Sequence, residues 1–330
     1  MADARALYPD FEVTRSWQLP AVPVASDDES LESYLMRIGF SDDQLYYTRR
    51  SWGNAAGDDI SRLSAEVSLV EINDESAGHG DYRILDGYDS LPNALSVGID
   101  VRLNTVVSSI DWEDDPVVVT TCTGETHRAE RVLITLPLGV LQAGNVHFSP
   151  ELPAEKQAAI DMLVMGPALK LIYRFAKPVL PPGMMALYSA TNPPMWWQPS
   201  TGHDTDVTIM TAFVTGDWAR ELHAEGEEGA LEHGFQTLQR ELGRELPRPL
   251  DAVMVNWIDD PFALGGYSVA PPGAANAREM LAQPTGERLF WAGEATAPNA
   301  WSSTVHGAYA SGRRAAAEIL VMLERQELSK

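Results

Sequence analysis

The 330-residue chain contains one cysteine, Cys122, and four lysines among its 24 basic residues. A single cysteine excludes an intrachain disulfide bond and a metal site built from a cysteine cluster. Because arginine supplies most of the positive charge, a lysine within an apolar strand pattern is unusual in this chain. Lys170, which is flanked by Leu169 and Leu171, is such a residue.

Long apolar runs and a basic surplus are also lacking. No stretch approaches the ~18 apolar residues that a membrane-spanning helix needs, and the first residues show no secretory signal pattern. With 47 acidic residues the net charge is −23, which disfavours nucleic acid as a main partner because phosphate binding needs a basic surface. We therefore expect a cytoplasmic protein with no membrane or nucleic-acid partner. The acidic surplus is typical of a solvated surface and also suits attraction of a cationic substrate.

Hydrophobic periodicity predicts the secondary structure. Helices are predicted over 30–38, 41–48, 90–97, 154–165, 229–242 and 304–323. Strands are predicted over 83–85, 101–110, 117–121, 126–135, 168–175, 207–213, 252–257 and 289–293. The Pro-, Trp- and Met-rich stretch 178–199 is predicted to be a loop. Strands and helices alternate less regularly than in a doubly wound sheet, which indicates the α/β class with mixed sheets.

Four sequence blocks follow one another along the chain. The first two are DGYDSLP at 86–92 with NTVVSSI at 104–110, and VLITLPLGVL at 132–141 with FSPELP at 148–153 and GPALK at 166–170. The other two are Trp257 with DP at 260–261 and GGYS at 265–268, and LFWAGE at 289–294 with STVHGA at 303–308 and SG at 311–312. In this order and spacing they resemble the flavin-containing amine oxidases, the family of monoamine oxidases, polyamine oxidases and lysine-specific histone demethylases.

The resemblance runs from about residue 30 to about residue 320 and implies two interleaved domains. We expect 86–141 and 286–330 to form a partial FAD/NAD(P)-binding-type domain. We expect 1–85 and 142–285 to form a substrate-binding domain with a mixed sheet flanked by helices.

The fourth block supplies most of the expected cofactor contacts. Gly293 ends a strand, where the lack of a side chain allows close approach of a ligand or backbone. The resemblance implies that Glu294 accepts hydrogen bonds from the ribityl chain of the flavin. It also implies that Thr304 and Val305, at a helix N-terminus that attracts negative charge, face the pyrimidine edge. The remaining residues expected to bind the cofactor are Val107, Pro137 and Trp257.

The expected catalytic residues are Lys170, Trp257 and Tyr267. A lysine at this strand position, taken alone, is typical of a solvated face. The resemblance implies instead that Lys170 holds a water against flavin N5 and assists reoxidation by oxygen. Trp257 and Tyr267 are core residues by default, and the resemblance implies that they form an aromatic wall around flavin and amine. Phe262 is expected to extend this wall.

Two departures from family patterns refine these expectations. The Gly265-Gly266-Tyr267 stretch has no cysteine, and Cys122 lies in a different strand–turn region, so FAD should be bound non-covalently. Thr304 occupies the position where monoamine oxidases have tyrosine, which favours the polyamine oxidase or demethylase branch.

The family begins with a strand, a G-x-G-x-x-G turn and a helix that bind the FAD pyrophosphate. This sequence lacks the motif, since Gly78-His79-Gly80 is followed by no third glycine. Three explanations stay open: a truncated reading frame, one half of a split oxidase whose other chain supplies the segment, and a domain kept for another purpose.

The function implied by the resemblance is FAD-dependent oxidation of a C–N bond of a (poly)amine to an imine. Hydride transfer to the flavin and reoxidation by O2 would complete the cycle, so the expected partners are a small-molecule amine and O2. Two alternatives remain. An L-amino-acid oxidase would need an arginine in the pocket to pair with the substrate carboxylate, and a non-catalytic remnant would bind partners through its sheet edge.

Overall fold

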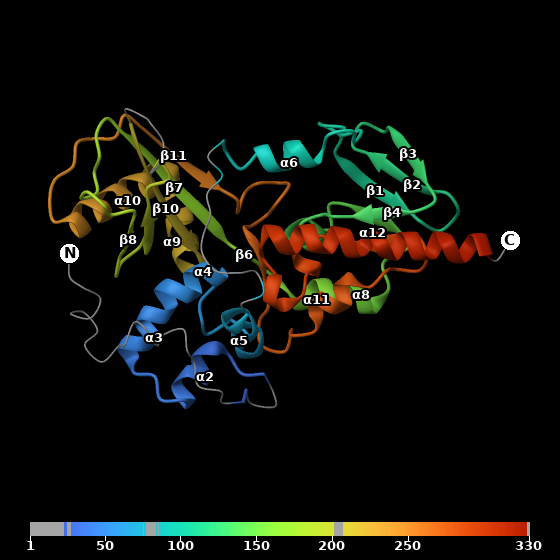
Figure 1. Ribbon diagram of the computed structural model, residues 1–330, viewed down its shortest axis with the longest axis horizontal. Helices are drawn as coiled ribbons and strands as arrows, with labels where there is room; N and C mark the ends of the chain where they lie inside the picture. Colours follow the sequence, from blue (N-terminus) through green and yellow to red (C-terminus); the bar gives the residue numbers. More distant parts are fainter. Residues whose placement is uncertain are drawn as a thin grey trace.

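The computed structural model of the protein describes residues 23–24, 28–74, 76, 84, 86–200 and 207–328. Within these residues, β-sheets and flanking helices form a mixed α/β fold (Figure 1), which confirms the expected fold class. Of the predicted strand 83–85 only Ile84 is described, so this prediction lies outside the described residues, as do Gly78 and Gly80.

An antiparallel five-stranded sheet forms one end of the molecule (Figure 1). Its strands run in the order β11 (Asp251–Asn256), β7 (Ala168–Phe175), β10 (Thr208–Thr215), β9 (Met195–Trp197) and β8 (Ala186–Tyr188). Side chains alternate along β7, so Leu169, Leu171 and Phe175 are buried on one face. The helices α9 (Gly216–Ala224) and α10 (Gly226–Leu242) pack on this face, while Lys170 lies on the opposite one.

The other end of the molecule carries two smaller sheets. One has the strand order β3 (Thr126–Ala129), β2 (Val117–Thr121), β1 (Val107–Asp111) and β5 (His147–Ser149), with β1 and β5 parallel. The other is a parallel pair of β4 (Val132–Ile134) and β13 (Leu289–Trp291). One apolar cluster that includes Ile110, Ile134 and Trp291 joins the two sheets.

Three strand and loop predictions are corrected by the structure. The predicted strand 126–135 is two strands, because 126–129 pairs with β2 whereas 132–134 pairs with β13. The predicted strand 101–110 begins only at Val107, since Asn104 has a φ of 56°, a left-handed conformation that interrupts an extended run. The stretch 178–199 is not a simple loop, because it contains β8 and β9.

The pairing of β4 with β13 connects the segments 86–141 and 286–330. We expected these two segments to form the partial cofactor domain, and the division into domains stays a prediction.

A helical unit precedes the sheets in the sequence. It comprises α2 (Leu31–Arg37), α3 (Asp42–Thr48), the π-helix η1 (Arg49–Gly53), α4 (Asn54–Ala56) and α5 (Ala65–Asn73). Ser30 and Ser41 cap the first two helices, and Gln44 completes a capping box with Ser41. These caps explain why the helices predicted over 30–38 and 41–48 are confirmed to within a residue or two.

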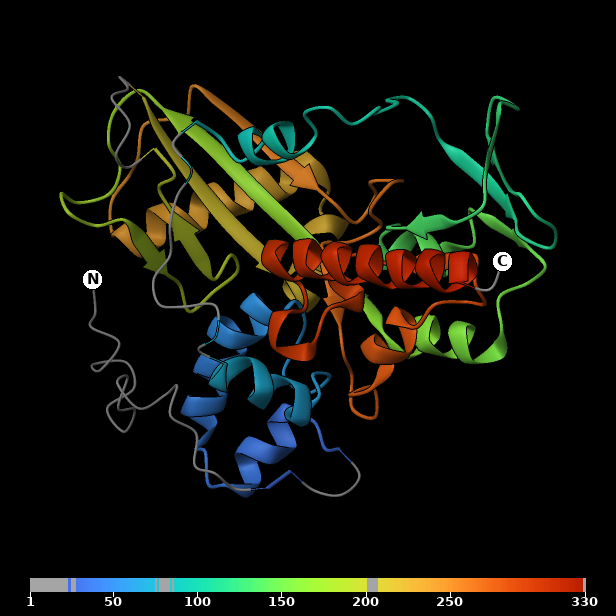
Figure 2. The same ribbon diagram turned by 45° about the vertical axis from the view of Figure 1, so that its right-hand side comes forward.

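The remaining elements join the two ends. They are α6 (Ser90–Leu95), α7 (Leu138–Ala143), α8 (Ala154–Met162), β6 (Val164–Gly166), β12 (Tyr267–Val269), α11 (Ala277–Ala282), the 3-10 turns η2 (Glu294–Thr296) and η3 (Asn299–Trp301), and α12 (Val305–Leu328). The predicted helix 154–165 is shorter, because β6 starts at Val164 and pairs with β12. α12 runs from the middle of the molecule to the end that carries β1 and β2 (Figures 1 and 2), and it packs on η2 and β13.

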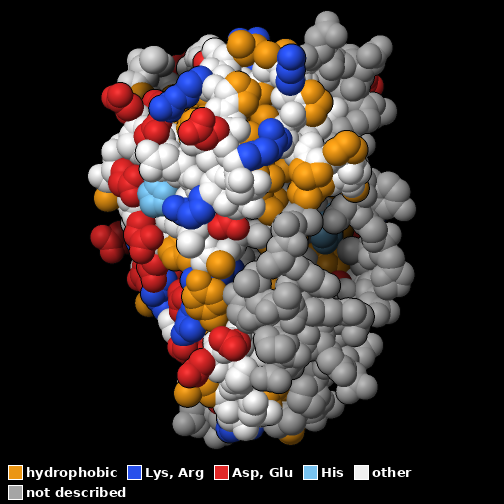
Figure 3. All heavy atoms as spheres, turned by 90° about the vertical axis from the view of Figure 1, so that its left-hand side faces the viewer, with side chains coloured by type: hydrophobic (Ala, Val, Ile, Leu, Met, Phe, Trp, Pro, Cys, Tyr) orange, Lys and Arg blue, Asp and Glu red, His pale blue; other side chains and the backbone are white. Residues whose placement is uncertain are grey.

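The surface agrees with the acidic composition. On the face at the left of Figure 1, acidic side chains gather along one edge with basic side chains among them (Figure 3). No helix in the described part of the chain is both long enough and apolar enough to cross a membrane.

Candidate cofactor and substrate site

Lys170 lies among aromatic rings. Its Nζ is 5.0 Å from the ring centroid of Trp257, 5.8 Å from that of Trp197 and 5.9 Å from that of Phe213. Phe213 is its cross-strand neighbour on β10. The side chain is partly buried, and burial lowers the pKa of the ammonium group. The surroundings are those of a cation–π site and differ from a freely solvated strand face.

Trp257 and Tyr267 are held differently. Trp257 follows β11, and its carbonyl accepts a hydrogen bond from the Gly265 N–H over 2.7 Å. Tyr267 begins β12, and its hydroxyl donates to the Ala55 carbonyl over 2.6 Å. Burial raises the pKa of the Tyr267 hydroxyl, and nearby Glu71 and Glu294 raise it further. Trp257 therefore lies beside Lys170, whereas the hydroxyl group of Tyr267 is hydrogen-bonded to the helical unit.

Close packing fixes the Tyr267 ring. Gly57 has a φ of 97°, and a Cβ atom there would lie 2.6 Å from Cε2 of Tyr267, so only glycine fits. Phe262, expected to extend the aromatic wall, is 62% exposed, which does not support that role. The proposed catalytic roles of Lys170, Trp257 and Tyr267 stay predictions.

A cavity of about 270 Å³ lies where β4 and β13 end, and we call it the Pro137 cavity. Its lining includes Pro137, Gly293 and Glu294, three expected cofactor residues from two separate blocks. Gly293 has a φ of 119°, and a Cβ atom there would meet nothing within 4 Å. Its N–H is already bonded to the Ser311 hydroxyl over 2.9 Å. A ligand could thus approach the Gly293 backbone closely without using that N–H as a donor.

Glu294 is engaged by three protein donors. Oε1 accepts from the Ser268 N–H over 2.9 Å, and Oε2 accepts from the Ser268 hydroxyl over 2.7 Å and the Ser303 N–H over 3.0 Å. Because a carboxylate offers about four acceptor positions, one position remains for a ligand hydroxyl. The carboxylate also helps to hold Ser303 at a φ of 61°, a left-handed conformation that is costly for serine.

The other expected cofactor residues do not line this cavity, and they are held in different places. Thr304 caps α12: its hydroxyl oxygen accepts from the Gly307 N–H over 3.0 Å and donates to the Trp301 carbonyl over 2.6 Å. This confirms the predicted N-terminus of the last helix, and Val305 follows with half of its surface exposed. Val107 starts β1 and packs on the apolar cluster of Ile134 and Trp291. Neither Val107 nor Val305 lines the Pro137 cavity.

A second cavity of about 240 Å³ contains residues that the sequence did not single out, and we call it the Arg278 cavity. Its polar lining comprises Arg278, Glu71 and the serines Ser68, Ser268, Ser302 and Ser303, together with Thr304. Arg278 is 2% exposed, and burial lowers its pKa. Burial raises the pKa of Glu71, although Arg278 and the Ser302 hydroxyl oppose the shift. An arginine on a short helix gives no sequence signal of such a position.

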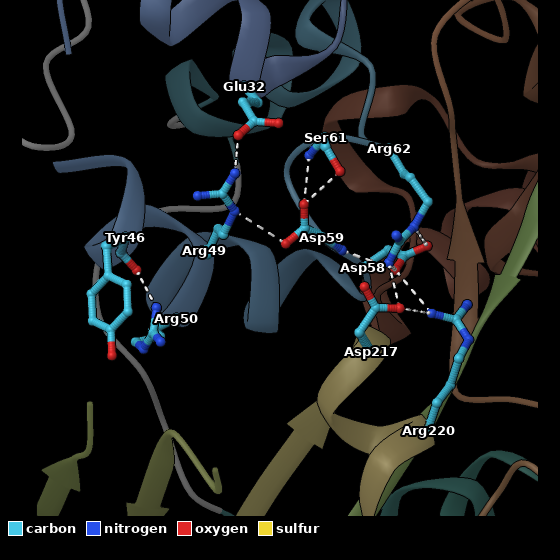
Figure 4. Close-up of polar contacts among 10 residues, drawn as sticks. All are labelled: Glu32, Tyr46, Arg49, Arg50, Asp58, Asp59, Ser61, Arg62, Asp217 and Arg220. Carbon is cyan, nitrogen blue, oxygen red and sulfur yellow. Dashed lines mark hydrogen bonds and ion pairs between the residues drawn. The ribbon is translucent and has the colours of Figure 1, made fainter. Parts of the chain in front are cut away.

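A third cavity of about 300 Å³ lies between the helical unit and α9. Asp58, 4% exposed, accepts hydrogen bonds from Arg62 over 2.6 and 3.1 Å and from Arg220 over 3.4 Å (Figure 4). Burial alone would raise the pKa of Asp58, but hydrogen bonds from Arg62 and the Asp59 N–H and the two guanidinium charges lower it overall. This network joins the helical unit to α9, and we interpret its role as structural.

The sequence profile of the family described as flavin containing amine oxidoreductase matches residues 7–320. The chain belongs to this family, and the resemblance drawn from the four blocks is confirmed.

Relatives and solved structures refine the assignment. The chain is 33% identical over 253 residues to lysine-specific histone demethylase 1B of Mus musculus, covering 73% of this chain and 30% of that protein. It is 32% identical over 260 residues to polyamine oxidase 4 of Oryza sativa subsp. japonica, covering 77% and 52%. The chain thus spans about half or less of the length of these relatives.

Two solved structures share the fold. Putrescine oxidase bound to putrescine aligns with a TM-score of 0.77 at 20% identity, covering 92% of this chain and 70% of that chain. Cyclohexylamine oxidase from Brevibacterium oxydans aligns with a TM-score of 0.77 at 19% identity, covering 94% and 71%.

Proposed function

We propose that this chain forms the substrate side and part of the flavin side of an FAD-dependent amine oxidase. The reaction would convert the C–N bond of an amine to an imine. The observation that carries the proposal is the meeting of Pro137, Gly293 and Glu294 in one cavity, because these residues come from blocks more than 150 positions apart in the sequence. The polyamine oxidase and putrescine oxidase among its relatives and structural neighbours support an amine substrate.

The residues present fit part of a flavin. Gly293 leaves its backbone open to the Pro137 cavity, and Glu294 keeps one acceptor position for a ribityl hydroxyl. The N-terminus of α12 after Thr304 offers backbone N–H groups to an electron-rich ring edge. FAD, when bound, would supply the acceptor for the hydride equivalent that leaves the substrate carbon and would return the electrons to O2.

The protein residues would tune this chemistry. Lys170 would hold a water and present a positive charge beside the ring system, since its ammonium group is partly buried among Trp257, Trp197 and Phe213. A charge in such a low-dielectric setting acts more strongly than in water. Non-covalent binding is supported by the position of Cys122, which lies exposed in the turn after β2, whereas Tyr267 belongs to β12 of a different sheet.

The pyrophosphate of FAD is the part that the chain fits poorly. The lining of the Pro137 cavity contains no lysine or arginine, and the sequence contains no G-x-G-x-x-G turn. We propose that a segment with this turn, on a separate chain, adds strands to the β4–β13 pair. Two-stranded parallel sheets are unusual, because parallel strands are normally buried within larger sheets.

Reconstitution tests this function. The 330-residue chain would be mixed with FAD and with a polypeptide carrying a strand, a G-x-G-x-x-G turn and a helix, and then titrated anaerobically with putrescine. We expect a yellow complex whose flavin absorbance bleaches on amine addition and returns with O2. A complex that binds FAD but is not bleached by amines or amino acids would indicate the non-catalytic alternative.

A further inference from the structure

Arg278 is hydrogen-bonded to a serine that also binds Glu294. Its Nη2 donates to the Ser268 carbonyl over 3.0 Å and to the Ser268 hydroxyl oxygen over 3.1 Å. The same hydroxyl donates to Oε2 of Glu294 over 2.7 Å. Because an arginine side chain can only donate hydrogen bonds, the Ser268 oxygen accepts from Arg278, and its single proton is directed to Glu294. Arg278 thus acts on an expected cofactor residue although it does not line the Pro137 cavity.

Ser268 also connects Arg278 to the start of α12. The Ser268 carbonyl accepts from Arg278 and, over 2.6 Å, from the Ser303 hydroxyl. The Ser303 N–H in turn donates to Oε2 of Glu294 over 3.0 Å, and Ser303 immediately precedes Thr304, the N-cap of α12. Arg278, Ser268, Glu294 and Ser303 therefore form one connected set of hydrogen bonds beside the expected flavin edge.

The stability of the fold gives little reason for a charge at this position. Arg278 is 2% exposed, and its Nε and Nη1 have no hydrogen-bond partner in the described part of the chain. Burial lowers the pKa of Arg278, and the charges of Glu294 and Glu71 oppose that shift. A buried charge with unsatisfied donors is costly, and a well-packed apolar side chain in such a place is often equally stable or more stable.

Replacing Arg278 by an apolar residue would also leave no polar atom of the Ser268 side chain or carbonyl unpaired. The Ser268 carbonyl would keep the Ser303 hydroxyl, and the Ser268 hydroxyl would keep Glu294. What the replacement would remove is the donor that directs the Ser268 proton and the positive charge that strengthens this chain of bonds. The effect of Arg278 on Glu294 therefore explains its presence better than stability does.

The free acceptor position of Glu294 lies on Oε1. Among the described residues Oε1 accepts only the Ser268 N–H, over 2.9 Å, whereas Oε2 accepts two donors, and each carboxylate oxygen offers about two positions. Donors on both oxygens fix the plane of the carboxylate. The free position on Oε1 then keeps one direction in the wall of the Pro137 cavity, which Glu294 lines.

We propose that Arg278 is a positioning residue for the flavin: acting through Ser268, it holds Glu294 so that Oε1 accepts a hydroxyl group of the ribityl chain. The inference rests on the proposed function and extends it to a residue outside the Pro137 cavity. Loss of Arg278 should therefore impair recognition of the ribityl chain and leave recognition of the flavin ring system unchanged.

Two flavins that differ only in the ribityl chain test this role by binding alone. Riboflavin has the chain, whereas lumiflavin carries a methyl group in its place. The 330-residue chain would be titrated into each flavin, and quenching of flavin fluorescence would give the two affinities. We expect riboflavin to bind about tenfold more tightly than lumiflavin, the ratio that a ~1.4 kcal/mol gain produces.

Variants assign this preference to residues. R278M should reduce the riboflavin-to-lumiflavin ratio to about one without weakening lumiflavin, and R278K, which keeps a charged donor, should restore part of the ratio. E294Q, which replaces one acceptor oxygen by an NH2 donor, should cause the same loss. The double variant R278M/E294Q should show no further loss, because both residues act on one bond. R248M, which changes an exposed arginine paired with Glu232, is the control and should keep the full ratio.

Structural damage gives a different result. Equal weakening of riboflavin and lumiflavin in R278M would indicate that Arg278 only supports the fold, and it would overturn the positioning role. If circular dichroism shows that R278M does not fold, S268A takes its place, because it removes only the hydroxyl that connects Arg278 to Glu294. S268A should lose the same preference.

The remaining outcomes separate this inference from the oxidase function. An unchanged ratio in folded R278M or S268A, or no preference for riboflavin in the unsubstituted chain, would overturn the role of Arg278 even if the reconstituted complex oxidises putrescine. A riboflavin preference that depends on Arg278, together with a reconstituted complex whose flavin no amine reduces, would support the positioning role and reject the oxidase.

Discussion

The hydroxyl group of Ser268 donates to Oε2 of Glu294 over 2.7 Å, and this bond joins β12 to the turn after β13. The Ser268 N–H bonds the same carboxylate, and the Ser268 carbonyl accepts from Arg278 and from the Ser303 hydroxyl. Ser268 is fully buried. One serine thus ties the cofactor side of the fold to the Arg278 cavity, so a change at Glu294 should affect folding as well as flavin binding.

We expect Glu294→Ala to lower the free energy of unfolding by ~2–4 kcal/mol. The substitution leaves the N–H group of buried Ser268 and that of partly buried Ser303 without an acceptor, and each unsatisfied buried group costs ~1–3 kcal/mol. Urea denaturation followed by tryptophan fluorescence would measure the loss. Glu279→Ala, at an exposed position on α11, should stay within ~0.5 kcal/mol of the unsubstituted chain. Equal stability of the Glu294 variant would show that water replaces the carboxylate at no cost.

Lys170→Met should slow flavin reoxidation in the reconstituted complex by ~10²-fold, the size of effect seen when one preorganised charge or donor is removed. FAD affinity should change much less. Stopped-flow mixing of the reduced complex with O2 measures the reoxidation rate. The control is Lys177→Met, which changes an exposed lysine just after β7 and should leave that rate unchanged. Identical reoxidation in Lys170→Met would remove the proposed role.

The position of Lys170 also predicts that the flavin reoxidation rate depends on pH. Burial lowers the pKa of Lys170, so its ammonium group loses its proton at a lower pH than an exposed lysine does. The reoxidation rate should therefore fall as pH rises through that lowered pKa. The Lys170→Met complex should show no such fall, and a fall in both complexes would assign the titration to another group.

Asp58 should make the chain sensitive to acid. Its folded-state pKa lies below the ordinary value of 3.8, so its contribution to stability is present above pH ~4 and is lost as pH falls through the folded-state pKa. Asp58→Asn should therefore lower the free energy of unfolding at pH 7 by ~1–3 kcal/mol. This loss is smaller than for a fully buried ion pair, because solvent screens the partly exposed Arg62 and Arg220. The deficit should shrink below pH 4. Asp114→Asn, on an exposed loop, should show no pH-dependent difference, and a constant deficit for Asp58→Asn would contradict the lowered pKa.

The elements that the sequence predicts correctly are those whose local hydrophobic pattern matches their burial in the folded chain. β7 was predictable because its alternation of Leu169, Lys170 and Leu171 persists in a sheet with one buried face. α12 was predictable from its N-cap at Thr304 and the small residues after it. By contrast, α9 was not predicted, although Ala219 and Leu222 lie on one buried face of it; it begins at Gly216, whose φ of 61° is typical of a turn.

Features that depend on contacts between distant segments could not be predicted from the sequence. Residues 126–135 read as one strand, yet the two halves belong to different sheets, and the choice depends on β13, which lies more than 150 residues later. Arg278 gave no signal for the same reason: its burial depends on α5, more than 200 residues earlier in the sequence, as well as on the nearby β12. Glu294 was found as a candidate, but its three protein donors could be seen only in the folded chain.

The last prediction concerns FAD and the 330-residue chain alone, which should bind it weakly or not at all. The Pro137 cavity, at about 270 Å³, is slightly smaller than the ~300–1,000 Å³ typical of ligand sites. It has no basic lining residue for the pyrophosphate, and an unpaired phosphate charge is costly to bury. The net charge of −23 adds a repulsive field. Fluorescence quenching of FAD measures its binding to the 330-residue chain. Riboflavin, which lacks the phosphates, is the matched probe, and we expect the chain to bind riboflavin more tightly than FAD. Tight stoichiometric FAD binding by this chain would show that other residues replace the glycine-rich turn, and the proposed second chain would then be unnecessary.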